Sequence, residues 1–229
     1  MIRYLSIPIM CLIALGCFAA KQPNTIERLL LEYGKPNRPI YQQQCVRPKA
    51  FSEIYYVCLY LDYLDNGNAS KYLSGIPENK DDLNGLWQAN SAFGNIIPPS
   101  PLPPIMHEGS FSDIFINVIF QQMLKGNTTA YKKYFYLYYN EGEAYGEGMD
   151  DQLDHLITDH PLVVLRDWHT LGPFLKKTAL ETAVISSQKV DLLKQYRQIC
   201  MTNKRLNQSS CQGIMGWLMR LPTRDVPPS

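Results

Sequence analysis

The sequence predicts a mainly α-helical fold of antiparallel helical hairpins, in the form of an α-solenoid-like stack or an irregular bundle, with two disulfides. Three observations predict this fold. Apolar residues recur with helical spacing through much of the chain, helices in the second half start about every 17 residues, and four cysteines form two close pairs. Hydrophobic residues make up 45% of the 229 residues, which excludes a disordered chain and predicts a packed core.

Two short helices are expected in the first half of the chain. Apolar residues recur at helical spacing from Ile26 to Tyr33, and Gly34 supplies a stop signal. The second helix is expected over 81–92, around Leu83.

The segment 50–65 fits either a helix or a strand. Its apolar residues form one helical stripe, but several of them also alternate with tyrosines as they would in a strand. Asn66-Gly67 fits a hairpin turn as well as a helix stop. We favour the helix, and the alternative is a small β-hairpin near 54–73.

Five prolines, at positions 98, 99, 101, 103 and 104, interrupt the chain between its two halves. Each removes a backbone donor and restrains the preceding residue to extended angles, so 95–106 is expected to be a polyproline-like connector. It separates an N-terminal helical subdomain, 21–94, from a helical-hairpin domain, 107–221, which a loose tail, 222–229, follows. A proline-rich ligand for another domain is the alternative interpretation.

The second half contains a series of helices separated by short connections. Ser110 or Ser112 can cap the first of them, and Asn127 can cap the second. Pro161 opens the fourth, which should end before Gly172-Pro173. Short connections force neighbouring helices antiparallel, so pairs recur about every 33 residues, although no tetratricopeptide, ankyrin or HEAT consensus is matched. The expected helices cover 110–125, 127–140, 144–158, 161–171, 178–200 and 209–221.

Residues 1–20 show the pattern of a signal peptide: a charged start, an apolar stretch and small residues before Lys21. The apolar stretch is short for a bilayer span, so we expect export to the periplasm or the extracellular space. Ala14-Leu15-Gly16-Cys17 also partly matches a bacterial lipoprotein site with cleavage before Cys17. Acylation of Cys17 would anchor the protein to the outer membrane, and no other membrane contact is expected.

Four cysteines remain in the expected mature chain, in two close pairs: Cys45, Cys58, Cys200 and Cys211. In an oxidising compartment they are expected to form two disulfides. Four cysteines allow three pairings, of which Cys45 with Cys58 and Cys200 with Cys211 is the simplest. A zinc site built from the four thiolates is the alternative, although no Cys-x-x-Cys spacing occurs.

The charge composition argues against one large class of partners. Lys plus Arg total 22 against 21 for Asp plus Glu, which gives a net charge of +1. A protein that binds nucleic acid normally carries a strong positive excess, so nucleic acid is not an expected partner.

The densest charged stretch, 141–159, contains seven carboxylates. On a helix most of these side chains share one face, which is typical of a solvated surface. The sharper interpretation is a divalent-cation site, because Asp151, His155 and Asp159 follow each other at i, i+4 and i+8. The stretch matches neither a His-Glu-x-x-His motif nor an EF-hand loop, and no cofactor is expected.

Few residues point to catalysis. His155 and His169 can act as general bases near neutral pH. The chain has no Gly-x-Ser-x-Gly elbow and its mature thiols are expected to be paired, so nucleophilic catalysis is not indicated. Two carboxylates can hydrolyse a polysaccharide from distant positions in the sequence, and Glu108 with Asp167 is the first pair to test.

Tyrosines gather in 131–139 beside two lysines. Packing between helices explains such a cluster. Alternatively, the tyrosines form a contact surface, because tyrosine is common in binding hot spots. The candidates for such an interface are Tyr131, Tyr134, Tyr138 and Tyr139.

These observations predict an exported, non-catalytic helical protein that binds a protein partner, in one version a periplasmic partner or inhibitor of an envelope enzyme. Repeated antiparallel helices offer an extended surface that typically serves protein contacts. The alternative is a hydrolase of cell-wall or extracellular polymers that uses carboxylate and histidine catalysis, with Glu108, His155 and His169 as candidates.

Overall fold

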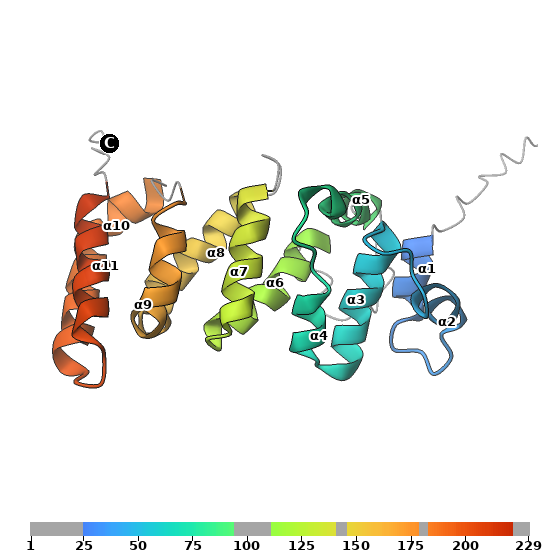
Figure 1. The fold of residues 1–229 in the computed structure, drawn as a ribbon, viewed down its shortest axis with the longest axis horizontal. Helices are drawn as coiled ribbons and strands as arrows, with labels where there is room; N and C mark the ends of the chain where they lie inside the picture. Colours follow the sequence, from blue (N-terminus) through green and yellow to red (C-terminus); the bar gives the residue numbers. More distant parts are fainter. Residues whose placement is uncertain (1–24, 94–110, 141–145, 179–182, 222–229) are drawn as a thin grey trace, which may run out of the picture.

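The computed structural model describes residues 25–93, 111–140, 146–178 and 183–221, and all regular structure in these ranges is helical. The helices follow one another along one long axis (Figure 1). They are α1 Thr25–Glu32, α2 Pro39–Cys45, α3 Glu53–Asn66, α4 Ala69–Ser74, the 3-10 helix η1 Lys80–Leu83, α5 Asn84–Phe93, α6 Phe111–Leu124, α7 Thr128–Asn140, α8 Gly146–Asp159, α9 Pro161–Leu175, α10 Ala183–Thr202 and α11 Gln208–Arg220. The mainly helical fold is confirmed.

Five predictions concern residues outside the described ranges and stay predictions. They are the signal peptide 1–20, acylation of Cys17, the connector 95–106, catalysis by Glu108 and the tail 222–229. Among the described helices, none has both the length and the apolar character that crossing a membrane requires.

The alternative β-hairpin near 54–73 is wrong, because α3 and α4 occupy this stretch. Ser52 caps α3 by accepting a hydrogen bond from Tyr55 N (3.2 Å), and Gly67 ends it in the left-handed conformation (φ 64°). Residues 56–61 are all buried, because α3 packs against α1, α2, α4 and α5. A helix covered on several sides needs apolar residues all round, which produced the strand-like alternation in the sequence.

Both of the simplest disulfide pairings are confirmed. Cys45–Cys58 joins α2 to α3, and Cys200–Cys211 joins α10 to α11. The alternative zinc site is wrong, because all four thiols are paired in disulfides.

The helices before and after the proline-rich segment share one hydrophobic core. Tyr72 of α4 packs on Phe115 of α6 with ring centroids 4.9 Å apart, and its hydroxyl donates a hydrogen bond to the Phe115 carbonyl (2.8 Å). The buried Lys133 of α7 donates to the Ile76 carbonyl, in the loop after α4 (2.7 Å). The division of the chain at 95–106 stays a prediction, but the helices on its two sides stabilise each other.

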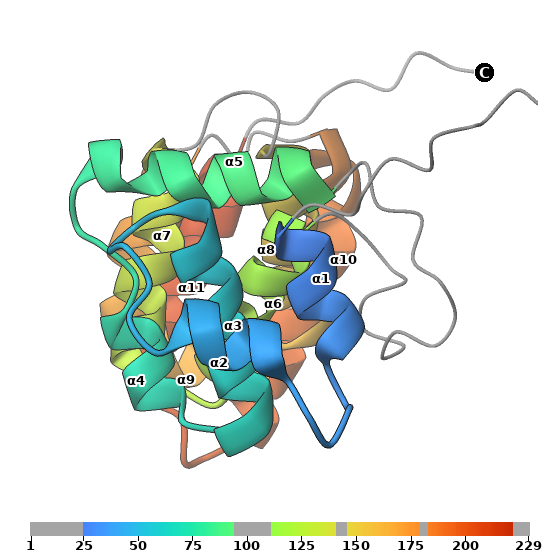
Figure 2. The same ribbon diagram turned by 90° about the vertical axis from the view of Figure 1, so that its right-hand side faces the viewer.

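In the second half, neighbouring helices pack in pairs: α6 with α7, α8 with α9, and α10 with α11. Contacts also join α8 to both α6 and α10, and α9 to both α7 and α11. Figure 2, a view along the row, has α1, α2 and α3 in front of the later helices. The first helices therefore form one end of the row, and α10 and α11 form the other (Figure 1).

Helix α9 continues beyond its expected stop at Gly172-Pro173 and ends at Leu175. Pro173 lies in the last turn, where the helix loses the hydrogen bond of the missing N–H and then stops. Gly172 is buried against the Trp168 indole, so packing explains its presence. The glycine and the proline were correct signals for the end of the helix but not for its last residue.

Candidate functional site

Helix α8 brings three predicted site residues to one hollow. The hollow has a volume of about 420 Å³ and is lined by Asp151, Asp154, His155, Thr158, Asp159 and, from α10, Gln188. His155 Nδ1 and Asp159 Oδ2 are 2.9 Å apart, and both side chains are exposed. The hydrogen bond from His155 is the main cause that lowers the pKa of the Asp159 carboxyl.

No described residue adds a further ligand to the predicted metal site. Within the described residues, no group of three or more His, Cys, Asp or Glu side chains is placed to hold a metal ion. Of Asp151, His155 and Asp159, the last two are hydrogen-bonded to each other. An exposed histidine beside a carboxylate can accept a proton, and solvent and salt screen the charges of such a pair. Metal binding by these three residues stays a prediction.

Asp167, from the predicted carboxylate pair, belongs to a polar clasp between α7 and α9. The Tyr131 hydroxyl donates to Asp167 Oδ2 (2.5 Å), and Arg166 Nη2 donates to the same oxygen (2.6 Å). Burial by itself raises the pKa of Asp167, but the hydrogen bonds from Arg166 and Tyr131 hold the pKa below its ordinary value of 3.8. The exposed His169 lowers this pKa further. The carboxylate thus serves to join two helices.

Replacing Asp167 with Asn is expected to lower the free energy of unfolding at pH 7 by about 1 to 2 kcal/mol, because charge-assisted hydrogen bonds are lost. The folded-state pKa of Asp167 is depressed, so its stabilisation is complete well above 3.8 and disappears as the pH falls through the folded-state value. Urea unfolding should therefore show a difference between wild type and D167N that shrinks from pH 7 to pH 3. Asp191→Asn is the control, because Asp191 is an exposed carboxylate. This substitution should change the free energy of unfolding by less than about 0.5 kcal/mol. An equal effect of D167N at both pH values would contradict the clasp.

The tyrosines predicted as an interface all form hydrogen bonds within the chain. Tyr131 and Tyr134 are completely buried, and the Tyr134 hydroxyl donates to the Met149 carbonyl of α8 (2.9 Å). Tyr138 donates to Asp150 Oδ1 (2.7 Å). Tyr139 is 42% exposed and donates to the carbonyl of Phe174, at the end of α9 (2.9 Å). Tyr131 and Tyr134 are covered completely by helix packing. A role in a surface interface stays a prediction for Tyr138 and Tyr139.

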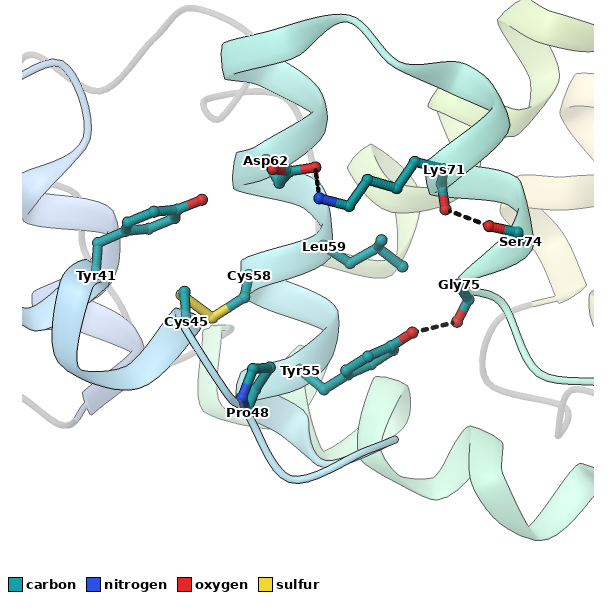
Figure 3. Close-up of a pocket in the computed structure, with 10 residues that line it drawn as sticks. All are labelled: Tyr41, Cys45, Pro48, Tyr55, Cys58, Leu59, Asp62, Lys71, Ser74 and Gly75. Atoms are coloured by element: carbon teal, nitrogen blue, oxygen red, sulfur yellow. Dashed lines mark hydrogen bonds and ion pairs between the residues drawn. A yellow bond between two sulfur atoms is a disulfide. The ribbon is translucent and has the colours of Figure 1, made fainter.

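A hollow of about 370 Å³ lies beside the first disulfide, among α2, α3 and α4 (Figure 3). Its lining residues are Tyr41, Cys45, Pro48, Tyr55, Cys58, Leu59, Asp62, Lys71, Ser74 and Gly75. Lys71 Nζ lies 3.0 Å from Asp62 Oδ2, and the Tyr55 hydroxyl donates to the Gly75 carbonyl (2.9 Å). The lining of this hollow is mixed, because Leu59 and Pro48 lie beside the polar side chains of Asp62, Lys71 and Ser74. The two cysteines in the lining are joined in the disulfide and are therefore not free nucleophiles.

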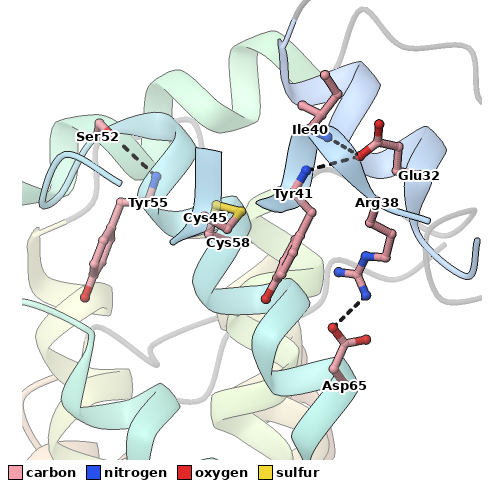
Figure 4. Close-up of a disulfide and its surroundings, with 9 residues drawn as sticks. All are labelled: Glu32, Arg38, Ile40, Tyr41, Cys45, Ser52, Tyr55, Cys58 and Asp65. Carbon is pink, nitrogen blue, oxygen red and sulfur yellow. Dashed lines mark hydrogen bonds and ion pairs between the residues drawn. A yellow bond between two sulfur atoms is a disulfide. The ribbon is translucent and has the colours of Figure 1, made fainter. Parts of the chain in front are cut away.

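Polar contacts beside the same disulfide fix α2 against α1 and α3 (Figure 4). The Glu32 carboxylate accepts hydrogen bonds from Ile40 N (2.8 Å) and Tyr41 N (3.1 Å), which satisfies the N-terminus of α2. Arg38 pairs with Asp65 (2.7 Å) and lies over the Tyr41 ring, 4.0 Å from its centroid. These contacts are structural, and they give Glu32, Arg38 and Asp65 a role in holding the first three helices together.

Two adjoining hollows near the C-terminal end of α10 were missed by the sequence analysis. The first, of about 250 Å³, is lined by Lys194, Arg197, Gln198, Met201 and Thr202. The second, of about 600 Å³, is lined by Asp159, His160, Pro161, Leu162, Val163, Ile199, Thr202 and Asn203. Because Thr202 lines both hollows, we call them together the α10 groove. One signal in the sequence could have revealed this groove: apolar and basic residues recur at helical spacing in α10, at Val190, Lys194, Arg197 and Met201.

Three surface features thus remain as candidate sites. The His155–Asp159 pair offers an exposed histidine beside a carboxylate, the hollow at the first disulfide offers a mixed polar and apolar lining, and the α10 groove offers apolar and cationic side chains. Comparison with protein-family models, with curated proteins and with solved structures finds no match for this chain.

Proposed function

We propose that this chain is an exported, non-catalytic helical protein that acts by binding another protein. The observation that carries this proposal is the pattern of helix contacts in the second half. We interpret α6, α8 and α10 as one layer and α7, α9 and α11 as a second, which is how an α-solenoid is built. Such stacks present extended surfaces, and their usual role is to bind other proteins.

Two further observations support export. Structural disulfides form and persist in oxidising compartments such as the periplasm or the extracellular space, and the described part of the chain contains two. The expected signal peptide in 1–20 agrees with the same route. In its finer form, the proposal makes the protein a periplasmic partner or inhibitor of an envelope enzyme, held at the outer membrane if Cys17 is acylated.

Affinity isolation of the processed full chain from an envelope extract tests this function. We expect the wild type to retain a partner through washing, and His155→Ala and His169→Ala to retain as much of it. A broad interface depends on hot-spot residues, each worth about 2 kcal/mol or more, and the proposal does not require either histidine. Recovery of no protein above the level of an unloaded column would overturn the proposal.

The His155–Asp159 pair favours one alternative, hydrolysis of a cell-wall or extracellular polymer. A histidine held by a carboxylate is a common arrangement for a general base. If this alternative holds, His155→Ala should abolish the release of soluble fragments from the polymer while circular dichroism stays unchanged. Glu108→Gln and His169→Ala belong in the same assay. No release of fragments by the wild type would remove the alternative.

A further inference from the structure

Helix α10 carries an exposed stripe of apolar and basic residues. Val190, Lys194, Arg197 and Met201 follow each other at i, i+4, i+7 and i+11 and therefore lie on one face of the helix, which we call the α10 stripe. Val190 is 61% exposed and Met201 is 75% exposed. Side chains of these types are usually buried, so their joint exposure on one face is a feature that needs an explanation.

The surface beside the stripe is hollowed. Lys194, Arg197 and Met201 belong both to the stripe and to the α10 groove. Leu162, at the start of α9, is 52% exposed and lines the adjoining hollow together with Ile199. Methionine adapts its shape to different partners and is over-represented at protein-binding surfaces. The groove therefore has the apolar lining and the concave form that receive side chains from a partner.

The charge of α10 and α11 is one-sided. Helices α10 and α11 with their connecting loop contain one acidic residue, Asp191, against the basic residues Lys189, Lys194, Arg197, Lys204, Arg205 and Arg220. Lys194 pairs with Asp191 (3.2 Å), and Lys189 donates to the Leu221 carbonyl (2.6 Å). Within the described residues, Arg197 forms no ion pair with a carboxylate, and Asp159 is the single carboxylate among them that lines the groove.

We propose that the α10 groove binds an acidic segment of a partner protein whose apolar side chains recur at helical spacing. The apolar side chains of this segment contact Met201, Leu162 and Ile199, and its carboxylates face Arg197 and Lys194. Arginine suits this role because its planar guanidinium binds a carboxylate through two parallel hydrogen bonds. This inference rests on the proposed binding function and assigns it a surface and a class of ligand.

Two other occupants fit the charges and the shape less well. A symmetric pair of copies joined through the α10 stripes would bring the cations of one copy toward those of the other, which opposes association. A membrane surface attracts cations, but faces that insert into the interface typically carry Trp, Phe or Leu, whereas the stripe has Val190 and Met201. Both occupants remain as distinguishable outcomes of the test.

Fluorescence anisotropy with three synthetic helical peptides tests the proposal on the processed full chain. All three peptides carry Leu at helical spacing, and their remaining positions are mainly Glu, mainly Gln or mainly Lys. We expect the Glu peptide to bind at low salt and at least about tenfold more tightly than the Gln peptide, and the Lys peptide not to bind. Raising the salt concentration should weaken binding of the Glu peptide, since the contacts are partly ionic.

Variants locate the binding to the groove. Arg197→Glu should weaken binding of the Glu peptide at least about tenfold. Met201→Gln should also weaken binding of this peptide, because it removes an apolar contact without changing the charge of the groove. Arg47→Glu is the matched control, because Arg47 is an exposed cation that follows α2 in the sequence. Helix α2 lies near the other end of the row (Figure 1). This substitution should leave binding unchanged. Thermal unfolding of each variant shows whether the fold is intact, and exposed positions 197 and 201 are expected to tolerate these substitutions.

Several outcomes would overturn the inference. The inference fails if the Glu peptide does not bind the wild type, or if the Gln peptide binds as tightly as the Glu peptide. It also fails if R197E and R47E lose the same amount of affinity for the Glu peptide. Binding to anionic phosphatidylglycerol vesicles that R197E abolishes would assign the groove to a membrane, and concentration-dependent dimers that R197E abolishes would assign it to a second copy. If R197E retains the envelope partner as well as the wild type does, the partner uses another surface: the inference fails and the binding function stands.

Discussion

Removal of both disulfides is expected to lower the free energy of unfolding by about 6 kcal/mol. Cys45–Cys58 and Cys200–Cys211 close loops with sequence separations of 13 and 11 residues, and each such loop stabilises the fold by about 3 kcal/mol in the chain-entropy model. Losing both removes about 6 kcal/mol, which is a large part of the stability of an ordinary domain, about 5 to 15 kcal/mol. Urea unfolding followed by circular dichroism measures the loss in the Cys→Ser pairs, separately and combined.

The reducing agent supplies the control. Dithiothreitol should destabilise the wild type as much as the combined serine substitutions do, and it should leave the four-serine variant unchanged. A wild type whose urea midpoint is the same with and without dithiothreitol would contradict the expectation and would remove the strongest support for an oxidising compartment.

Substituting Gly213 with Ala is expected to destabilise the fold by about 2 to 3 kcal/mol through overpacking. A Cβ at position 213 would collide with the indole nitrogen of Trp168, which is 6% exposed and also packs against Gly172 and Trp217. The indole is rigid and is held on three sides, so α9 and α11 must move apart. The loss exceeds the gain of about 1 kcal/mol that alanine brings to a helix over glycine.

Gly216 provides a matched control in the same helix. The nearest atom to a Cβ at this position is Arg220 Nη1, at 4.0 Å, so Gly216→Ala brings the helical gain without a collision. We expect it to raise the free energy of unfolding by up to about 1 kcal/mol. Equal effects of G213A and G216A in thermal or urea unfolding would show that α9 and α11 do not approach each other at Trp168.

Local signals in the sequence were enough to predict most helices of the second half. Asn127 caps α7 as expected, with Thr129 N (3.0 Å) and Ala130 N (3.3 Å) as donors, and Pro161 opens α9. Both features act within one turn of the chain, so neighbouring residues specify them. The disulfide pairing was also accessible, because closing a short loop between near cysteines costs less entropy than joining the two ends of the chain.

Local reasoning failed where a distant residue supplies the partner. Asn90 of α5 accepts a hydrogen bond from Ser112 N (3.0 Å), in the first turn of α6. Ser112 lies inside this helix and so is not its N-cap, while the expected cap by Ser110 lies outside the described residues and stays a prediction. The clasp of Asp167 with Tyr131 joins residues of two helices, and the spacing of residues along the chain contained no sign of this contact. The catalytic pairing of Asp167 with Glu108 stays a prediction, because Glu108 lies outside the described residues. Spacing along the chain carries no information on such contacts, because packing of whole helices decides them.

The sequence by itself determined that this protein is helical, that its second half is built from short helices, and that its cysteines pair within each end, since all three follow from interactions over about twenty residues or fewer. The tertiary structure decided which faces those helices bury. Tyr131 and Tyr134 enter the core while Val190 and Met201 stay exposed on α10, although apolar and aromatic residues alike favour burial. The physical reason is that a helix buries only the face its neighbours cover, and the positions of the neighbours are not encoded in the local spacing.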